Sequence, residues 1–307
     1  MRSDFMPNNI FTFVILHYLN FDDTLRCVNS ILDNVNYPDY NIVVVDNGSP
    51  NDSGKKLESH FGSKSEIQII LNQENLGFAR GNNVGYKYAK ETLKSDFIAL
   101  INNDTIIDQP DFIERVLQQF SRSRFHVLGP DIISLKDGHH QNPRPATLQD
   151  KEVLKKYLIN YRLSLTLNYI FLDKILEQLK KKIFPKPLLL PPVDFTAQDH
   201  NQEKLHAKLH GSALIFSPLY IAKYDGLNPD TFMYSEEAIL FYQIRLDGLI
   251  SIYDPKIKIW HKEDASTERM MGAGYKKRRF YLKNCLKSGK VLLKLMNESP
   301  LNSKKNQ

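Results

Sequence analysis

Short apolar runs of strand length recur through the first 135 residues, and segments with helical spacing separate them. The runs are residues 11–16, 42–45, 67–71 and 97–101. Residues 22–32, 81–93 and 112–120 instead place apolar side chains three or four positions apart, and Asp22 or Asp23 is suited to cap the first of these helices. Alternating strands and helices predict a mostly parallel sheet with crossover helices, so we expect an α/β fold.

Polar residues directly follow three of these runs. They are His17-Tyr18, Asp46-Asn47 and Asn102-Asn103-Asp104. Ligands of parallel sheets bind outside the carboxyl ends of the strands, so these residues are candidates for one common site. Taken singly, Asp46-Asn47 favours a turn, and Asn102-Asn103-Asp104 is at least as typical of a turn or a helix cap as of a metal site.

The segment 75–85 adds three glycines and three asparagines at the start of a predicted helix. Glycine lets the backbone approach a ligand closely, and a helix N-terminus attracts anions such as a diphosphate. The alternative is a glycine-rich turn before a helix.

The alternation stops at about residue 138 and returns after residue 205. Residues 172–183 place apolar side chains at helical spacing, and prolines 185, 187, 191 and 192 end that helix. Between residues 151 and 186 there are nine Lys and Arg against three acids, an excess equal to the net charge of +6 of the whole chain. Beyond this segment we expect a strand at 213–216, a helix at 236–246, a strand at 250–260 and an amphipathic helix at 275–295.

Charge and cysteine content exclude some classes of function. Charges outside the basic segment balance, so no broad basic face for a nucleic acid is expected. Two cysteines, Cys27 and Cys285, indicate a reducing compartment and no disulfide framework. The N-terminus has no apolar stretch typical of a signal peptide, so we expect a cytoplasmic protein.

Six segments in register resemble a glycosyltransferase family. VILHYLN, VVVDNGS, NLGFARGNNVG, LINNDT, MYSEEAIL and IWHKEDAST are similar, in order and spacing, to family 2 inverting glycosyltransferases with a GT-A fold. The similarity is strongest to the rhamnosyltransferase-like branch of bacterial surface-polysaccharide enzymes. It implies transfer of a sugar from a UDP- or dTDP-sugar to an acceptor hydroxyl, in capsule, exopolysaccharide or cell-wall synthesis.

The resemblance also implies roles for individual residues. Asp46 would accept a hydrogen bond from the pyrimidine N3–H. The residues expected to line the nucleoside and diphosphate are Tyr18, Asn75, Gly77, Asn83, Asn103 and Asp104. Asp104, with His261 in support, would bind Mg²⁺ or Mn²⁺. Asn102 stands where the family has the first acid of its Asp-x-Asp motif, so one carboxylate remains and weak metal affinity is expected.

The catalytic base implied by the resemblance is Glu237, the second acid after the run Phe232-Met233-Tyr234-Ser235. The family has Asp at this position, and glutamate is one methylene longer. Without the resemblance, two acids at a helix start would be explained by the helix dipole. Gly211 and Glu236 are expected on the acceptor side.

These expectations define four segments: 1–137 for the nucleotide sugar, 138–205 as a basic helical insertion, 206–272 for the acceptor and catalysis, and 273–307 as a C-terminal helix and tail. Residues 151–192 are expected either to pack on the protein's own core, to contact a second copy in a homodimer, or to touch the inner face of the plasma membrane beside a lipid-linked acceptor.

Two other functions remain open at this stage. One is a family member that binds nucleotide or lipid without transfer, suggested by the reduced metal motif. The other is a sugar nucleotidylyltransferase, which would need a glycine-rich loop with an Arg/Lys pair near the N-terminus, whereas this chain has HYLNFDD there.

Overall fold

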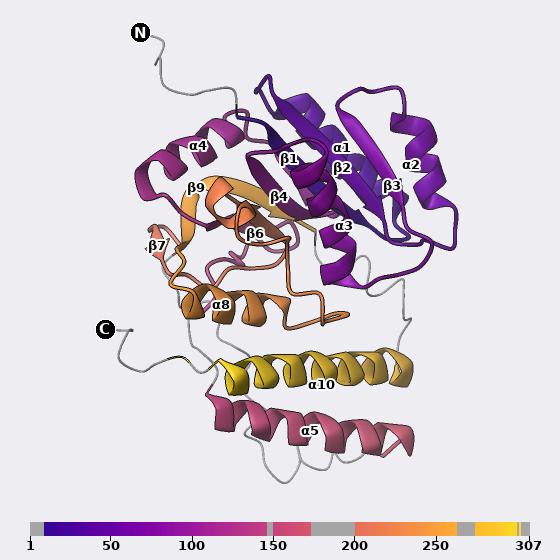
Figure 1. Cartoon of the computed structure of the whole chain (residues 1–307). Helices are drawn as coiled ribbons and strands as arrows, with labels where there is room; N and C mark the ends of the chain where they lie inside the picture. The colour runs from indigo at the N-terminus through magenta and orange to yellow at the C-terminus, as the bar shows by residue number, and fades with distance from the viewer. Residues whose placement is uncertain (1–8, 146–149, 173–199, 263–273, 300, 302–307) are drawn as a thin grey trace.

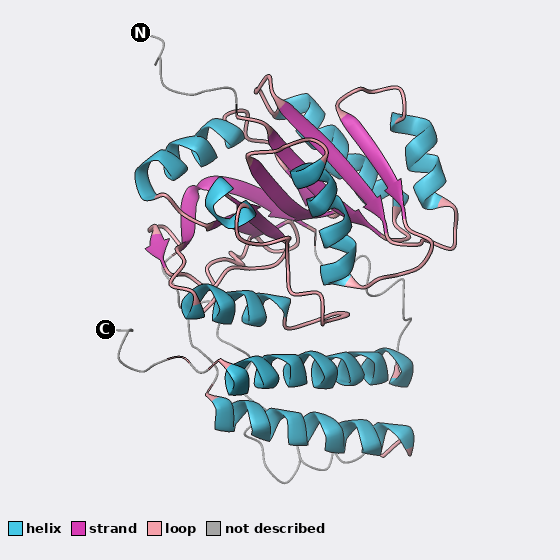
Figure 2. Ribbon diagram, viewed as in Figure 1, coloured by secondary structure: helices cyan, strands magenta, loops and turns pink. Residues whose placement is uncertain are grey.

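A computed structural model describes residues 9–145, 150–172, 200–262, 274–299 and 301 of the chain. One sheet of nine strands forms its centre (Figures 1 and 2). The strands are β1 (Phe11–His17), β2 (Tyr40–Asp46), β3 (Ile67–Leu71), β4 (Phe97–Asn102), β5 (Thr105–Ile106), β6 (Val127–Ser134), β7 (Lys204–Leu205), β8 (Ala213–Phe216) and β9 (Ser251–His261). The spatial order is β3-β2-β1-β4-β8-β6-β9-β5, and β7 pairs with β9.

The first four strands of the chain run parallel, as the sequence predicts. β1 pairs with β2 on one side and β4 on the other, and β2 pairs with β3. The chain thus proceeds from β1 outward to β3 and then returns to the opposite side of β1. Such a reversal separates the loops that leave β1 and β4, which leaves room for a ligand at their carboxyl ends. β8 then lies antiparallel between β4 and β6.

Helices cover both faces of the sheet. They are α1 (Phe21–Asn34), α2 (Ser53–Phe61), α3 (Phe78–Glu91), α4 (Phe112–Ser123), α7 (Pro218–Ile221) and α8 (Glu236–Leu246). Successive side chains of a strand point to opposite faces of the sheet, so the core has two parts. Phe13 belongs to the cluster that contains residues of α1, α2 and α4, and Val14 to the cluster that contains residues of α3, α7 and α8. This arrangement confirms the predicted α/β fold of the GT-A type.

Two long helices form a separate layer beneath the sheet (Figure 1). α10 (Tyr275–Glu298) packs against α8, and α5 (Lys151–Tyr169) packs against α10 through Leu154 and Leu158. Within the described residues, no helix combines the length and apolar character that a membrane span requires.

Local predictions from the sequence agree with the structure to different degrees. The expected capping role of Asp22 or Asp23 is wrong, because both residues lie in the first turn of α1 and Asn20 is the cap residue. α3 begins at Phe78, three residues before the predicted start, and β6 extends to Ser134. The helix α2 was not predicted. The helix predicted at 172–183, except Leu172, and the prolines that follow it lie outside the described residues.

Gly85 lets α3 lie close to the sheet. A Cβ atom at this position would stand 2.4 Å from Val14 Cγ1 and 2.9 Å from Val45 Cγ2. We expect Gly85→Ala to lower the free energy of unfolding by about 1–3 kcal/mol, because valine has little rotameric freedom to yield. Urea unfolding measures the change. Lys87→Ala, on the exposed side of the same helix, should stay within about 0.5 kcal/mol of the parent, and equal stability of the two variants would contradict this account of the packing.

Candidate active site

A cavity of about 500 Å³ opens at the carboxyl ends of β1 and β4, where the strand order reverses. Its walls come from the loops after β1, β2 and β4, from residues 141–144, from the turn before β8, from the start of α8 and from the end of β9. The sequence-predicted residues that line it are Tyr18, Asn75, Gly77, Asn103, Asp104, Gly211, Glu236, Glu237 and His261. Segments far apart in the chain therefore meet at one site.

Asp104 and His261 form a buried pair on one wall. β5 and β9 pair antiparallel, which brings His261 Nε2 to 3.1 Å from Asp104 Oδ1. On the other side of the ring, His261 Nδ1 lies 2.8 Å from Gln141 Oε1. When Nδ1–H donates to Gln141, Nε2 turns its lone pair toward the carboxylate. The lone pairs of His261 Nε2 and Asp104 Oδ1 would repel each other at 3.1 Å unless a cation or a proton lies between the two atoms.

The pair fits the divalent cation that the sequence predicts. A carboxylate oxygen and an imidazole nitrogen, with a carbonyl-type oxygen orienting the imidazole, are ordinary ligands and support for Mn²⁺. Among the described residues no group of three or more His, Cys, Asp and Glu side chains gathers as a metal site. Asp104 and His261 would therefore supply two ligands to the cation, and oxygens of the bound nucleotide sugar would supply the others.

Asp104→Asn should weaken Mn²⁺ binding by at least roughly tenfold, since the charge of the ligands sets affinity for such cations. Conversely, Asn102→Asp should strengthen binding, because Asn102 also lines the cavity. Thermal unfolding in the presence of UDP, titrated with Mn²⁺, measures both. An Mn²⁺ dependence that is the same in both variants and the parent would exclude this pair as the cation site.

The loop before α3 is held at the cavity by side-chain amides. Asn47 Nδ2 donates to Asn75 Oδ1 and to the Gly77 carbonyl, both at 3.1 Å, and Asn47 Oδ1 accepts from the Leu76 amide at 3.0 Å. Gly77 has φ +83°, and a Cβ there would lie 2.3 Å from the Phe232 carbonyl oxygen. Glycine is therefore required where the loop meets the segment before α8.

Asp46 and Asn83 lie outside the lining of the cavity. Asp46 is buried at the end of β2, and its carboxylate accepts from the Ser49 amide at 3.2 Å. Burial raises its pKa, against the effect of the Ser49 hydrogen bonds. Asn83 Oδ1 accepts from the Leu227 amide at 2.8 Å, and its Nδ2 donates to the Leu227 carbonyl at 2.7 Å, so its side chain joins α3 to the loop at 227. Neither is among the described residues that line the cavity.

Glu237 presents a charged carboxylate to the same cavity. Its Oε1 accepts from the Gly211 amide at 2.6 Å, and its Oε2 lies 3.8 Å from Arg144 Nε. Burial alone would raise its pKa, but Arg144, together with the Gly211 amide and Lys208, brings it below the ordinary value. The carboxylate is thus ionised at neutral pH and can accept a proton.

Glu236 differs from its neighbour although both line the cavity. Burial raises the pKa of Glu236 to about 7. At neutral pH this side chain is therefore protonated for part of the time, whereas the Glu237 carboxylate is ionised. The Glu237 carboxylate is thus available to accept a proton throughout the neutral range, whereas that of Glu236 is available only in its unprotonated fraction.

Sequence reasoning assigned no role to three residues that line the cavity: Gln141, Arg144 and His210. Gln141 and Arg144 belong to a proline-containing stretch without periodicity, and the backbone hydrogen bond from the Arg144 amide to the Lys208 carbonyl fixes that stretch beside β8. His210 lies 3.9 Å from Glu237 Oε1 through its Nδ1, and its ring centre is 5.9 Å from that of His261. Burial lowers the pKa of His210 to about 3, so this ring is neutral.

Arg144→Ala should move the acidic limb of the pH–activity profile to higher pH. The Arg144 guanidinium lowers the pKa of Glu237, and the ionised base is lost as the pH falls through that pKa. Without the cation the pKa rises, and activity is lost earlier on acidification. The profile of kcat/KM against pH measures this, and Arg144→Lys, which keeps the charge, should retain more of the parent's profile. Coincident acidic limbs in the parent and Arg144→Ala would contradict the role of Arg144.

The open, mostly parallel sheet with a cavity at its strand reversal is the architecture of a GT-A nucleotide-sugar transferase fold. Residues 12–179 match glycosyl transferase family 2. Because this match covers more than half of the chain, the protein belongs to that family.

A relative supports the same assignment. The chain is similar to the low-salt glycan biosynthesis hexosyltransferase Agl10 of Haloferax volcanii, with 23% identity over 208 residues. The aligned region covers 67% of this chain and 54% of the relative, so the chain spans about half the length of that protein.

Proposed function

We propose that the protein is an inverting glycosyltransferase that moves a sugar from a UDP- or dTDP-sugar to the hydroxyl of a glycan acceptor. The observation that carries this proposal is the line of contacts from Glu237 through His210 and His261 to Asp104. It places an ionised carboxylate and a candidate cation pair in one cavity. Membership of glycosyl transferase family 2 and the hexosyltransferase name of the relative support a hexose as the transferred sugar.

The proposed reaction is a single displacement at the anomeric carbon. Glu237 takes the proton of the acceptor hydroxyl while the acceptor oxygen bonds to that carbon and the bond to the diphosphate oxygen breaks. The attack comes from the face opposite the leaving group, so the configuration inverts. A bound cation would supply positive charge near the diphosphate. The backbone of the loop at 75–77, held by Asn47, would line the donor.

The proposed acceptor is lipid-linked and the proposed pathway is bacterial surface-polysaccharide synthesis, of the kind carried out by rhamnosyltransferase-like enzymes on the cytoplasmic side of the membrane. The sequence motifs support this proposal, and so does the name of the relative, which is a glycan biosynthesis hexosyltransferase. The first experiment is a panel of labelled UDP- and dTDP-sugars with Mn²⁺, scored for binding and for transfer. Transfer identifies the donor, whereas donor binding with neither transfer nor hydrolysis would favour a family member that only binds nucleotide.

Glu237→Gln should lower turnover by about 10²–10⁴-fold while donor binding stays close to that of the parent. Glutamine keeps an oxygen for the Gly211 amide but cannot take the acceptor proton. Initial rates at saturating donor, with donor affinity measured by calorimetry, separate the two effects.

Glu236→Gln is the matched control for this substitution. The raised pKa of Glu236 makes glutamine a close replacement for its protonated form, so we expect turnover within a few-fold of the parent. A large loss in Glu236→Gln with little loss in Glu237→Gln would transfer the role of base to Glu236.

A further inference from the structure

The layer formed by α5 and α10 carries the net positive charge of the protein. The two helices carry twelve Lys and Arg (Lys151, Lys155, Lys156, Arg162, Lys276, Lys277, Arg278, Arg279, Lys283, Lys287, Lys290 and Lys294) against Glu152 and Glu298. Their net charge is +10, whereas the remaining 29 Lys and Arg and 33 Asp and Glu give the rest of the chain −4. The sequence predicted a basic segment at 151–186, and the structure adds α10 to it.

The outer side of α5 is apolar as well as basic. Ile159 and Leu163, four residues apart, lie on one side of the helix and are 66% and 53% exposed. Ile170, the residue that ends the helix, is 57% exposed. The buried Leu154 and Leu158 lie on the other side, against α10. After the helix ends, Phe171 packs edge-on against Tyr275 of α10, and Leu172 is 42% exposed.

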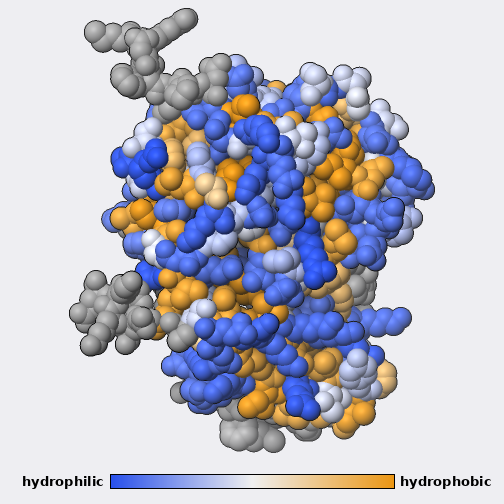
Figure 3. All heavy atoms as spheres, viewed as in Figure 1, coloured by the Kyte–Doolittle hydropathy of each residue, from blue (hydrophilic) through white to orange (hydrophobic). Residues whose placement is uncertain are grey.

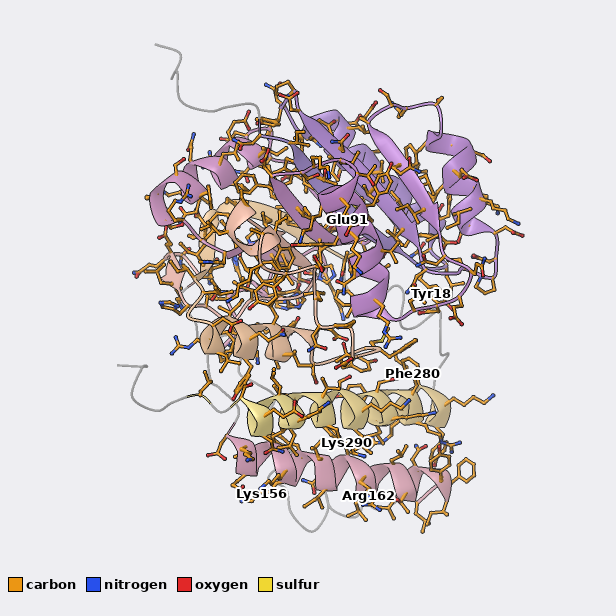
Figure 4. All side chains as sticks on the ribbon, viewed as in Figure 1. Tyr18, Glu91, Lys156, Arg162, Phe280 and Lys290 are labelled. Atoms are coloured by element: carbon orange, nitrogen blue, oxygen red, sulfur yellow. The ribbon has the colours of Figure 1, made fainter. Side chains whose placement is uncertain are left out.

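Exposed cations flank this apolar stripe. Figure 4 shows Lys156 and Arg162 on the side of α5 turned away from α10, and Lys155 is also exposed. Figure 3 shows hydrophilic and hydrophobic side chains next to one another over the same layer. A helix with exposed apolar residues between lysines and arginines is suited to lie in the headgroup region of an anionic membrane.

The same layer contacts the acceptor part of the cavity. Ser288 Oγ on α10 donates to the Met233 carbonyl at 2.9 Å, and Met233 lines the cavity just before Glu236 and Glu237. The ring of Phe280 lies 6.2 Å from that of Phe232 in an edge-to-face arrangement. The layer and the cavity are therefore held in one fixed arrangement.

We infer that the outer face of α5, supported by the charge of α10, docks on an anionic lipid bilayer. A second copy of the chain is less suited to this face, because a symmetric dimer through it would bring two layers of net charge +10 together. Docking itself is independent of the transfer reaction. Its consequence, that a lipid-linked acceptor reaches the cavity from this side, rests on the proposed function.

Co-sedimentation of the full-length protein with vesicles tests the docking. We expect binding to phosphatidylcholine vesicles that contain phosphatidylglycerol, little binding to phosphatidylcholine alone, and weakening by salt. Lys155→Glu with Arg162→Glu should weaken binding by roughly tenfold or more, and Ile159→Glu with Leu163→Glu should weaken it similarly. Binding indifferent to anionic lipid, or unchanged in both double variants, would overturn the inference.

Matched controls use residues of similar exposure away from this layer. Leu205→Glu, at a position 60% exposed on β7, and Lys56→Glu, exposed on α2, should bind vesicles as the parent does.

Light scattering after gel filtration detects the competing outcome, which is a dimer formed through this face. If the protein does not bind vesicles, and Ile159→Glu with Leu163→Glu dissociates a dimer, the face belongs to a contact with a second copy. Binding of the donor sugar is measured on every variant, so a failed docking prediction is distinguishable from a failed transferase proposal.

Discussion

The reversal of strand order beside β1 is the constraint on which the site depends. Parallel pairing of β1 with both β2 and β4 brings the ends of these strands to the same edge of the sheet. Because the chain leaves β1 and β4 in different directions, the loops diverge and a cavity forms between them. Antiparallel pairing of β5 with β9 then returns His261 to the end of β4, beside Asp104. Elements from both halves of the chain are thus required to bring Asp104 and His261 together.

Two adjacent glutamates acquire different protonation states from their surroundings. Burial has the largest effect on the pKa of Glu236 and raises it to about 7. Glu237 is half-buried, and Arg144 and the Gly211 amide stabilise its charged form. One helix start therefore supplies a partly protonated carboxyl and an ionised carboxylate to the same cavity, and their difference is a property of the packing of residues 144 and 211 against α8.

How much the sequence predicted depends on whether a signal was local. The strands at 67–71 and 213–216 and the helix at 236–246 have the predicted bounds, because their periodicity reports directly on which side chains are buried. The start of α3 at Phe78 was missed because Gly77, which precedes it, is fixed by a contact with Phe232, far away in sequence. The sequence likewise contains no sign of the contact that Asn83 makes: it predicts a residue that lines the nucleotide, and the structure shows its side-chain amide hydrogen-bonded to the backbone of Leu227.

The sequence by itself determined the α/β class, the family motifs and the polar residues at the ends of β1, β2 and β4. These follow from periodicity and residue type, which a single chain displays in order. Only the tertiary structure decided that Gln141 and Arg144 belong to the cavity, that Glu237 is ionised beside Glu236, and that α5 and α10 form one basic layer. The physical reason is that burial, ion pairing and surface charge depend on neighbours brought together across more than 100 residues of chain, such as Gln141 and His261.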